Sequence, residues 1–432
     1  MPHLHVKRGL DLAISGMPQG PIRSWFSPAR IALDFKAFRG TRIKLLVKIG
    51  QDVLLGEPLA EDRDFPGRFF PSPTTGRVLS IAREEKRALR HICITRADRE
   101  KPFPHQPPNW KTSSRQTLVD FLLKSGLFCH IRQRPFGMLA NPEAMPKSIF
   151  VKAIETAPFT PKASLQMQGH EEAISLGLTI LTRLTDGFVH VIQNSNDAPL
   201  KEIDRVQLHT IAGPHPAGNA STHIHFIDPI LHENHIIWTL NILDVMTIGY
   251  QFLQNRYFTD RIISIAGPGF SKTKRGFYRA QCGLSIEDLC QGNPPFHLIS
   301  GNPLTGWQVK PQDFLGFDHT VLSGFPENKK RRIFSFLWPW RQTTDISNST
   351  RIWGEKRAFV DGAPYDQVMP LDISTELLLK AVITKNDDLA DELGLLEVAS
   401  EDFALPAFVC PSKIEMIEIM QNALIRRAFN HT

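Results

Sequence analysis

The stretch VKIGQDVLLGEPLAEDRDFPGRFFPSPTTGRV, Val47–Val78, gives the clearest indication of how the first part of the chain folds. Short apolar runs in it alternate with turns that contain glycine or proline, and similar runs flank it, among them IALDF and HICITRA. Such spacing is typical of short strands in a compact all-β unit. We therefore predict an all-β domain over residues 1–105, followed by a linker within the polar, proline-rich stretch Arg99–Ser114.

The residue order of this stretch is similar to that of the barrel-sandwich hybrid of biotinyl and lipoyl carrier domains. The matching positions are Lys48, Gly50, Asp52, Val53, Gly56, Pro58, Leu59, Pro71, Pro73, Gly76 and Val78. Carrier domains attach their cofactor to a lysine in a hairpin, but no lysine lies between Lys48 and Lys86, and the predicted hairpin tip is Asp64–Gly67. We therefore interpret the domain as a rigid scaffold or docking module, since a fold alone does not carry function.

Beyond the linker, helical and strand patterns alternate up to about residue 250. Helical spacing occurs in Gln116–Leu127 and His170–Leu184, and buried strands are predicted for Ser148–Glu155 and Phe188–Gln193. This alternation indicates a parallel α/β sheet, and we assign it to a domain over residues 106–250. Short strands with glycine-rich ends predict a small α+β domain over 251–330, and the last 60 residues have helical patterns.

Composition limits the possible classes of protein. The chain has 432 residues, 42% of them apolar and 22% charged, which is ordinary for a globular protein of about three domains. The net charge of +6 permits an acidic partner or an anionic membrane surface but does not require nucleic acid. Five cysteines without a CxxC motif argue against a disulfide scaffold, a zinc ribbon and a cysteine-ligated cluster, and fit a reducing compartment. The most apolar long stretch, His235–Leu253, contains Asn241 and Asp244, so we predict a core segment there rather than a membrane span.

The segment IAGPHPAGNASTHIHFIDPI, Ile211–Ile230, is the first candidate for a site. Gly213 and Gly218 have the spacing of a phosphate loop, but the Lys-Ser/Thr pair that follows in such loops is missing. His215, His223 and His225 are candidate metal ligands, and His223 and His225 would share one face of a predicted strand. No third ligand is fixed by the pattern. The alternative is that the histidines form hydrogen bonds where the loop joins the strand.

The order GPHPAG followed by THIHFIDP resembles a signature of the NqrA family, the A subunits of the Na+-translocating NADH:quinone oxidoreductase (Na+-NQR). Six further segments match that family along almost the whole chain. They are KRGLDLAISGMP (7–18), SIFVKAIETAPFTP (148–161), IGYQ (248–251), RIISIAGPG (261–269), VMPLDI (368–373) and FVCPSK (408–413). Together, their order and spacing are specific for the family.

The resemblance implies an α/β multidomain fold. It consists of a biotinyl/lipoyl-like barrel-sandwich hybrid (1–105), a Rossmann-like domain (106–250), a ubiquitin-like SLBB domain (251–330), and a basic-aromatic segment with C-terminal helices (331–432). The related flavin-binding subunit of respiratory complex I and the C subunit of the Rnf complex bind FMN or iron–sulfur clusters. This chain lacks the glycine cluster for FMN, and Cys410-Pro411 alone remains at the matching cluster position. One thiolate cannot hold a [4Fe–4S] cluster.

The resemblance also implies a role in a complex that transfers electrons from NADH to ubiquinone and exports Na+. The chain would be a peripheral component on the cytoplasmic face of the bacterial inner membrane. Its partners would be the Na+-NQR subunits B to F, with the flavin-bearing membrane component, the B subunit, as its docking site. FAD, FMN, riboflavin and a [2Fe–2S] cluster would reside on those partners, and this chain would carry no covalent cofactor, metal or catalytic residue. The alternative is a scaffold paralogue without a redox role of its own.

Two groups of residues are candidates for contacts within that complex. A quinone headgroup needs hydrogen-bond donors beside an apolar slot, and His223, His225 and Phe226 offer such groups. The segment KKRRIFSFLWPWRQ, Lys329–Gln342, combines basic and aromatic residues that favour a membrane surface or a membrane partner. Its candidate contact residues are Arg331, Arg332, Phe336, Trp338 and Trp340. The alternative for this segment is a hairpin whose aromatic rings fold into the core.

Overall fold

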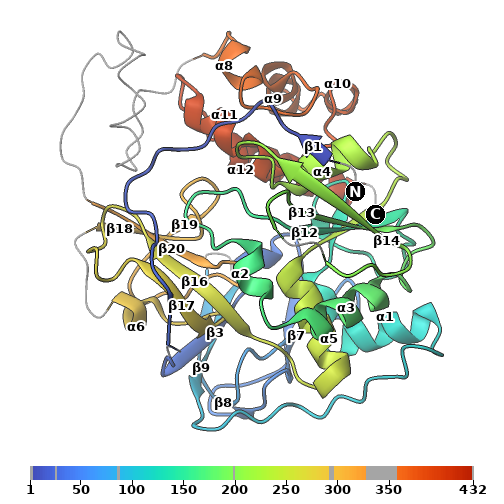
Figure 1. The fold of residues 1–432 in the computed structure, drawn as a ribbon, viewed down its shortest axis with the longest axis vertical. Helices are drawn as coiled ribbons and strands as arrows, with labels where there is room; N and C mark the ends of the chain where they lie inside the picture. Colours follow the sequence, from blue (N-terminus) through green and yellow to red (C-terminus); the bar gives the residue numbers. More distant parts are fainter. Residues whose placement is uncertain are drawn as a thin grey trace.

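The computed structural model describes residues 3–24, 27–84, 88–197, 200–290, 296–326 and 358–430. Within them the chain forms four β-sheets and a C-terminal group of helices (Figure 1). The segment Lys329–Gln342, with the contact candidates Arg331, Arg332, Phe336, Trp338 and Trp340, lies outside the described residues. No helix in the described ranges has both the length and the apolar character that a membrane crossing requires.

The N-terminal module packs a four-stranded sheet against a three-stranded sheet. The strands are β3 (Arg30–Asp34), β9 (Leu89–Arg96), β8 (Gly76–Arg83) and β5 (Asp52–Val53) in the first sheet, and β4 (Ile43–Leu45), β6 (Pro58–Asp62) and β7 (Phe69–Pro71) in the second. Alternate side chains of both sheets are apolar and fill the space between them. The ring of Phe70 is fully buried there and lies 4.7 Å from the ring of Phe38 and 5.6 Å from that of Phe35.

The β6–β7 hairpin, where a carrier domain would hold its lysine, is fixed to the next domain by Arg68. This side chain is 1% exposed and donates a hydrogen bond to the carboxylate of Asp62 at 2.9 Å. It also donates to the backbone carbonyl of Ala140, and its guanidinium lies 5.5 Å from the ring centre of Phe128. A hairpin anchored in this way supports the interpretation of the module as a scaffold, because a carrier hairpin must stay free.

A seven-stranded sheet forms the second domain. Its order is β1 (His3–His5), β14 (Val206–Ala212), β13 (Val189–Asn194), β12 (Ser148–Ala153), β15 (Ile237–Asn241), β10 (Arg132–Arg134) and β11 (Met138–Leu139). The first five strands are parallel to one another, β10 runs antiparallel to β15, and β11 runs antiparallel to β10. The predicted parallel sheet is thereby confirmed for the first five strands. The edge strand β1 comes from the very start of the chain, about two hundred residues before the strand with which it pairs.

Helices cover both faces of this sheet (Figure 1). The helices are α1 (Arg115–Lys124), α2 (Ala163–Met167), α3 (Glu171–Leu181), α4 (Ala220–Ile227) and α5 (Ile242–Gln254). Ile149 and Val151 of β12 face the core formed with α1, α3 and α5, whereas Phe150 faces α4. Because both faces are buried, the central strands are continuously apolar, as expected for parallel strands.

Helices α3 and α5 pack with their backbones in contact at two glycines. A Cβ atom at Gly249 would lie 1.8 Å from the carbonyl oxygen of Ala173, and one at Gly177 would lie 2.3 Å from that of Val245. Alanine usually stabilises a helix relative to glycine, but here any side chain must push the helices apart. Gly249→Ala should therefore lower the free energy of unfolding by about 1–3 kcal/mol, the usual cost of overpacking.

Urea unfolding checks this prediction, with Gln254→Ala at an exposed position of α5 as the control. A gain in stability for Gly249→Ala would show that the two helices are not in close contact.

The third domain is a mixed six-stranded sheet. Its order is β19 (Trp307–Val309), β18 (Phe296–Ser300), β20 (Val321–Pro326), β16 (Asp260–Ala266), β17 (Gly276–Gln281) and β2 (Ile22–Arg23), with the short helix α6 (Ile286–Cys290) beside it. Strand β2 pairs in parallel with β17. Residues 3–24 therefore run from the edge of the second domain to the edge of the third and connect the two sheets (Figure 1).

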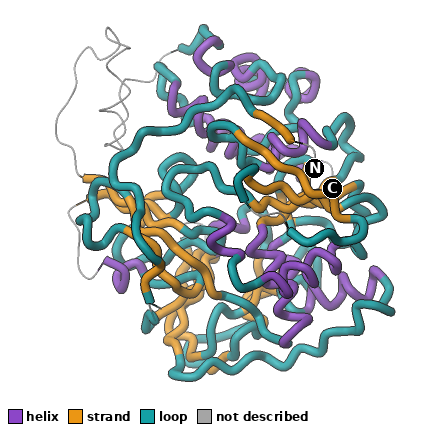
Figure 2. Tube along the Cα trace, in the orientation of Figure 1, coloured by secondary structure: helices purple, strands orange, loops and turns teal. Residues whose placement is uncertain are grey.

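The C-terminal residues form the predicted helical unit, which Figure 2 shows as a group of purple tubes at one end of the molecule. Its elements are α8 (Ala363–Asp366), α9 (Thr375–Ile383), α10 (Asp387–Glu392), η7 (Ser400–Phe403), α11 (Ala404–Val409) and α12 (Met416–Asn430). Tyr365, Leu378, Phe403 and Met420 are fully buried in its own core. The unit packs on the α4 side of the seven-stranded sheet, where Leu396 contacts the core around Ile224.

Candidate functional site

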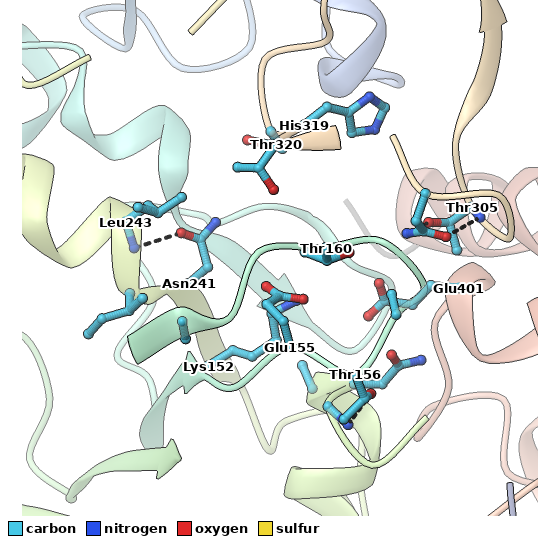
Figure 3. Close-up of a pocket in the computed structure, with 18 of the residues that line it drawn as sticks. Lys152, Glu155, Thr156, Thr160, Asn241, Leu243, Thr305, His319, Thr320 and Glu401 are labelled. Carbon is cyan, nitrogen blue, oxygen red and sulfur yellow. Dashed lines mark hydrogen bonds and ion pairs between the residues drawn. The ribbon is translucent and has the colours of Figure 1, made fainter. Parts of the chain in front are cut away.

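A cavity of about 330 Å³ lies where the second domain, the third domain and the C-terminal helices meet (Figure 3). The second domain contributes the ends of β12 and β15, including Glu155 and Asn241, and the loop that precedes α4. The third domain contributes the segments around Asn302 and Thr320, and Glu401 of η7 comes from the C-terminal helices. The volume is at the lower end of the range for small-molecule sites.

The position of this cavity follows from the strand order. The chain passes from β12 to β13 and β14 on one side of the sheet and then crosses to β15 on the other side of β12. The carboxyl ends of β12 and β15 therefore flank a topological switch point. In open α/β sheets, ligands bind in the crevice that such a point creates.

The charged side chains in the cavity are mostly paired with one another. Lys152 lies 3.0 Å from Glu155, and Arg132 lies 3.4 Å from Asp318. Burial lowers the pKa of Lys152, but the neighbouring Glu155 and Glu401 carboxylates raise it by more, so this ammonium stays charged. Burial lowers the pKa of His215 to about 4 and that of His319 to about 3, which makes both imidazoles neutral near pH 7.

The uncharged polar groups of the lining, apart from the histidines, are hydroxyls and amides, and they lie among aliphatic residues such as Leu240 and Leu243. These hydroxyls and amides belong to Thr156, Thr160, Gln166, Asn219, Thr239, Asn241, Asn302, Thr305 and Thr320. Among the described lining residues there is no Ser, Cys, Phe, Tyr or Trp. Thr156 is already engaged: its Oγ1 accepts from the Gly218 N–H at 3.0 Å and lies 3.0 Å from Nδ1 of His215. The arrangement can form hydrogen bonds to a ligand, but it contains no activated nucleophile.

A buried hydrogen-bond network forms one wall of the cavity. Nδ1 of His130 lies 2.7 Å from a carboxylate oxygen of Asp244, and Nε2 of the same ring lies 2.8 Å from the hydroxyl of Tyr257. Burial raises the pKa of Tyr257 well above its usual value, so the phenol keeps its proton. An annex of about 20 Å³ adjoins this network and has room for about one water molecule.

The structure corrects the prediction for His223 and His225. The segment that contains them is the helix α4, not a strand, so the two side chains point to different faces. The alternation in Thr222–Phe226 imitates a strand pattern. The helix forms because Gly218 and the extended Asn219 end the preceding loop, and because the following turn is buried against the sheet.

His223, His225 and Phe226 do not line the cavity and do not converge. His223 is 1% exposed, its Nε2 lies 2.8 Å from the carbonyl oxygen of Ala217, and burial lowers its pKa to about 3. His225 lies 3.0 Å from the carboxylate of Glu397 in the C-terminal helices. Phe226 is 44% exposed, and its ring centre lies 5.1 Å from that of His225.

The glycines of the possible phosphate loop have packing roles. A Cβ at Gly213, whose φ is +140°, would lie 2.4 Å from the carbonyl oxygen of Val6, and one at Gly218 would lie 2.8 Å from Oγ1 of Thr156. The two residues therefore let strand β1 and the end of β12 approach the loop. This contact explains their spacing without a phosphate.

The possible metal ligands are not gathered either. The described part of the chain contains no group of three or more His, Cys, Asp or Glu side chains that could hold a metal ion. All five cysteines lie in that part, and each is buried and free. Sγ of Cys410 lies 3.2 Å from the hydroxyl of Tyr365 within the C-terminal core.

Comparison with known proteins identifies the family. Residues 4–97 match the model of the NqrA N-terminal barrel-sandwich hybrid domain, and residues 113–257 match that of the NqrA second alpha/beta domain. The A subunit of the Na+-translocating NADH-quinone reductase of Chlamydia caviae is 34% identical, over 97% of this chain and 95% of the relative. The chain belongs to the NqrA family.

Other NqrA proteins are similar over the same length. Those of Tolumonas auensis and Vibrio parahaemolyticus are each 33% identical, over 98% and 97% of this chain and 98% of each relative. The predicted membership and the predicted barrel-sandwich module are thereby confirmed.

The cavity residues were not predicted, although part of the signal was in the sequence. Lys152 and Asn241 lie at the carboxyl ends of buried apolar strands and Glu155 follows shortly after one, and polar residues at strand ends of an α/β sheet mark its ligand edge. The other contributions from Asn302, Thr320 and Glu401 come from segments far away in the sequence. No local pattern indicates that these segments meet.

His225 connects α4 with the C-terminal helices in a pH-dependent way. The hydrogen bond to Glu397 raises the pKa of His225 against the effect of burial, and Asp372, which lies 3.9 Å from the ring and 3.6 Å from Arg8, adds to the shift. Because the pKa of His225 is higher in the folded than in the unfolded chain, its protonated ring stabilises the fold. This stabilisation is complete below the unfolded-state pKa of about 6.5 and is lost as the pH rises through the folded-state pKa.

We therefore expect amide hydrogen exchange around Glu397 to quicken, beyond its intrinsic pH dependence, as the pH rises from about 6.5 through the raised pKa of His225. His225→Gln should remove this excess. An equal excess in the variant would assign the effect to another group.

Proposed function

We propose that this chain is the peripheral, cytoplasmic-side component of a Na+-translocating NADH:quinone reductase, the complex that couples electron transfer from NADH to ubiquinone with Na+ export. The observation that carries the proposal is the similarity to named NqrA proteins over nearly the whole length of both chains. The chain docks on the flavin-bearing membrane component of the complex, the B subunit, and subunits B to F hold FAD, FMN, riboflavin and the [2Fe–2S] cluster. In this proposal the seven-stranded sheet is a Rossmann-like domain and the six-stranded sheet an SLBB, ubiquitin-like domain.

A mild-detergent pull-down of the tagged chain from its native membranes tests this proposal. We expect flavin-bearing membrane subunits in the eluate together with Na+-stimulated NADH:quinone activity. Recovery of the chain without flavin or activity would favour the alternative, a scaffold paralogue with no redox role of its own.

For quinone contact, the exposed ring of Phe226 is the best of the three predicted residues. It is the only one of them with a largely exposed side chain, and His225 beside it offers a polar group. His223 contributes indirectly, by fixing the start of α4 through its bond to Ala217. In the assembled complex, Phe226→Ser should raise the KM for ubiquinone about tenfold, which corresponds to the loss of about 1.4 kcal/mol of contact energy.

Leu389→Ser provides the matched control, because Leu389 is a comparably exposed apolar residue on α10. Equal KM values for the wild type and for Phe226→Ser, in complexes with normal subunit content, would show that Phe226 does not contact ubiquinone.

A further inference from the structure

We infer that the cavity between β12 and β15 binds a polyhydroxylated small molecule of the size of a monosaccharide. This inference does not rest on the proposed function, because it concerns the isolated chain. The argument starts from the place of the cavity, which is the topological switch point of the seven-stranded sheet.

Unpartnered hydroxyls point to the kind of ligand. Thr239 is 9% exposed and lines the cavity, and its hydroxyl forms no hydrogen bond with another described group. The hydroxyls of Thr160 and Thr320 likewise have no partner within the described ranges. Thr239 is nearly buried and Thr160 and Thr320 are half-buried, so these three cavity-lining hydroxyls can be satisfied only by water or by a ligand that both donates and accepts hydrogen bonds. The hydroxyls of a sugar have this property.

The three hydroxyls come from separate parts of the fold. Thr239 belongs to β15, Thr160 to the loop after β12, and Thr320 to the segment before β20. Figure 3 shows Glu155, Lys152 and Thr156 on one side of the cavity, His319 and Thr320 on the opposite side, and Glu401 on a third. A ligand in the centre would therefore meet hydrogen-bonding groups from several directions, and the Glu155 and Glu401 carboxylates can accept from neighbouring hydroxyls.

The charges of the site argue against a phosphate as the main recognised group. Lys152 and Arg132 are already paired with Glu155 and Asp318. The start of α5 also lines the cavity, but its backbone N–H groups are already used. The N–H groups of Leu243 and Asp244 donate to the side-chain oxygen of Asn241, so they are not free to bind a phosphate.

The lining also disfavours a quinone ring. An aromatic headgroup needs a flat apolar slot, and the described lining residues include no Phe, Tyr or Trp. The polar part of the wall consists of hydroxyl, amide and charged groups, and its apolar part is aliphatic, with Leu240, Ile242 and Leu243 among its residues.

Isothermal titration of the purified full chain tests the inference. The probes are D-ribose, sorbitol, D-ribose 5-phosphate and ubiquinone-1, each at millimolar concentration so that general stabilisation by excluded osmolytes stays small. We expect saturable binding of at least one of the uncharged polyhydroxylated probes. Thr239→Val keeps the shape of the side chain and removes its hydroxyl, and it should weaken that binding about tenfold.

Thr384→Val, at an exposed position that follows α9, is the control and should leave binding unchanged. If Thr239→Val does not fold, Thr320→Val at a less buried position replaces it. Three results would overturn the inference: no binding of any uncharged polyhydroxylated probe, binding that neither variant weakens, or binding of ubiquinone-1 that Thr239→Val alters. D-Ribose 5-phosphate bound far more tightly than D-ribose would also contradict it, because phosphate would then be the recognised group.

Discussion

Arg68→Ala should lower the free energy of unfolding by about 3–5 kcal/mol, the usual cost of removing one partner from a buried ion pair. The Asp62 carboxylate, which is as buried as Arg68, would remain without its cation. The carbonyl of Ala140 would also lose a donor, so the loss should separate the β6–β7 hairpin from the second domain. Urea unfolding gives the free energy, and amide exchange at Ala140 and its neighbours reports the separation.

Two variants make this prediction specific. Arg77→Ala removes an ion pair with Asp52 that is exposed to solvent, and it should leave the urea midpoint nearly unchanged. Arg68→Met combined with Asp62→Leu replaces the buried pair by apolar side chains and should recover much of the lost stability. If the double variant is as unstable as Arg68→Ala, the ion pair itself is not the cause of the loss.

His130→Ala should cost about 2–4 kcal/mol, because a buried carboxylate loses its partner and a buried phenol loses an acceptor or donor at the same time. The affected groups are Asp244 at the start of α5 and Tyr257 shortly after its end, so His130 connects both ends of this part of the core. We expect the loss to appear as a lower unfolding midpoint and as faster exchange in the first turn of α5.

Tyr257→Phe is the matched comparison for this network. It removes the hydroxyl alone and breaks a single hydrogen bond, which should cost about 1 kcal/mol. Equal losses for the two variants would mean that the bond between His130 and Asp244 contributes nothing to stability.

The sequence predicts well those elements whose burial and turns are indicated by the apolar, glycine and proline residues of the element itself. The continuous apolar run of Ser148–Ala153 indicates a strand that is buried on both faces, and the structure places it at the centre of the seven-stranded sheet. The glycine and proline positions of Val47–Val78 likewise indicate the turns of the barrel-sandwich module. The error in Thr222–Phe226 has the same origin, because five residues of alternating character fit a strand as well as one and a half turns of helix.

The sequence therefore predicts the family, the barrel-sandwich module, the parallel α/β sheet and the helical C-terminal part, since each depends on patterns that repeat within a short segment or on motifs in a fixed order. Three contacts could be found only in the folded chain: His3–His5 completes the sheet edge beside β14, Arg68 joins two domains, and His225 contacts Glu397. The same holds for the cavity, whose walls come from residues as far apart as His130 and Glu401. Each of these contacts joins segments that are far apart in the sequence. A local residue pattern reveals the secondary structure of its own segment but not which distant residues that segment will contact.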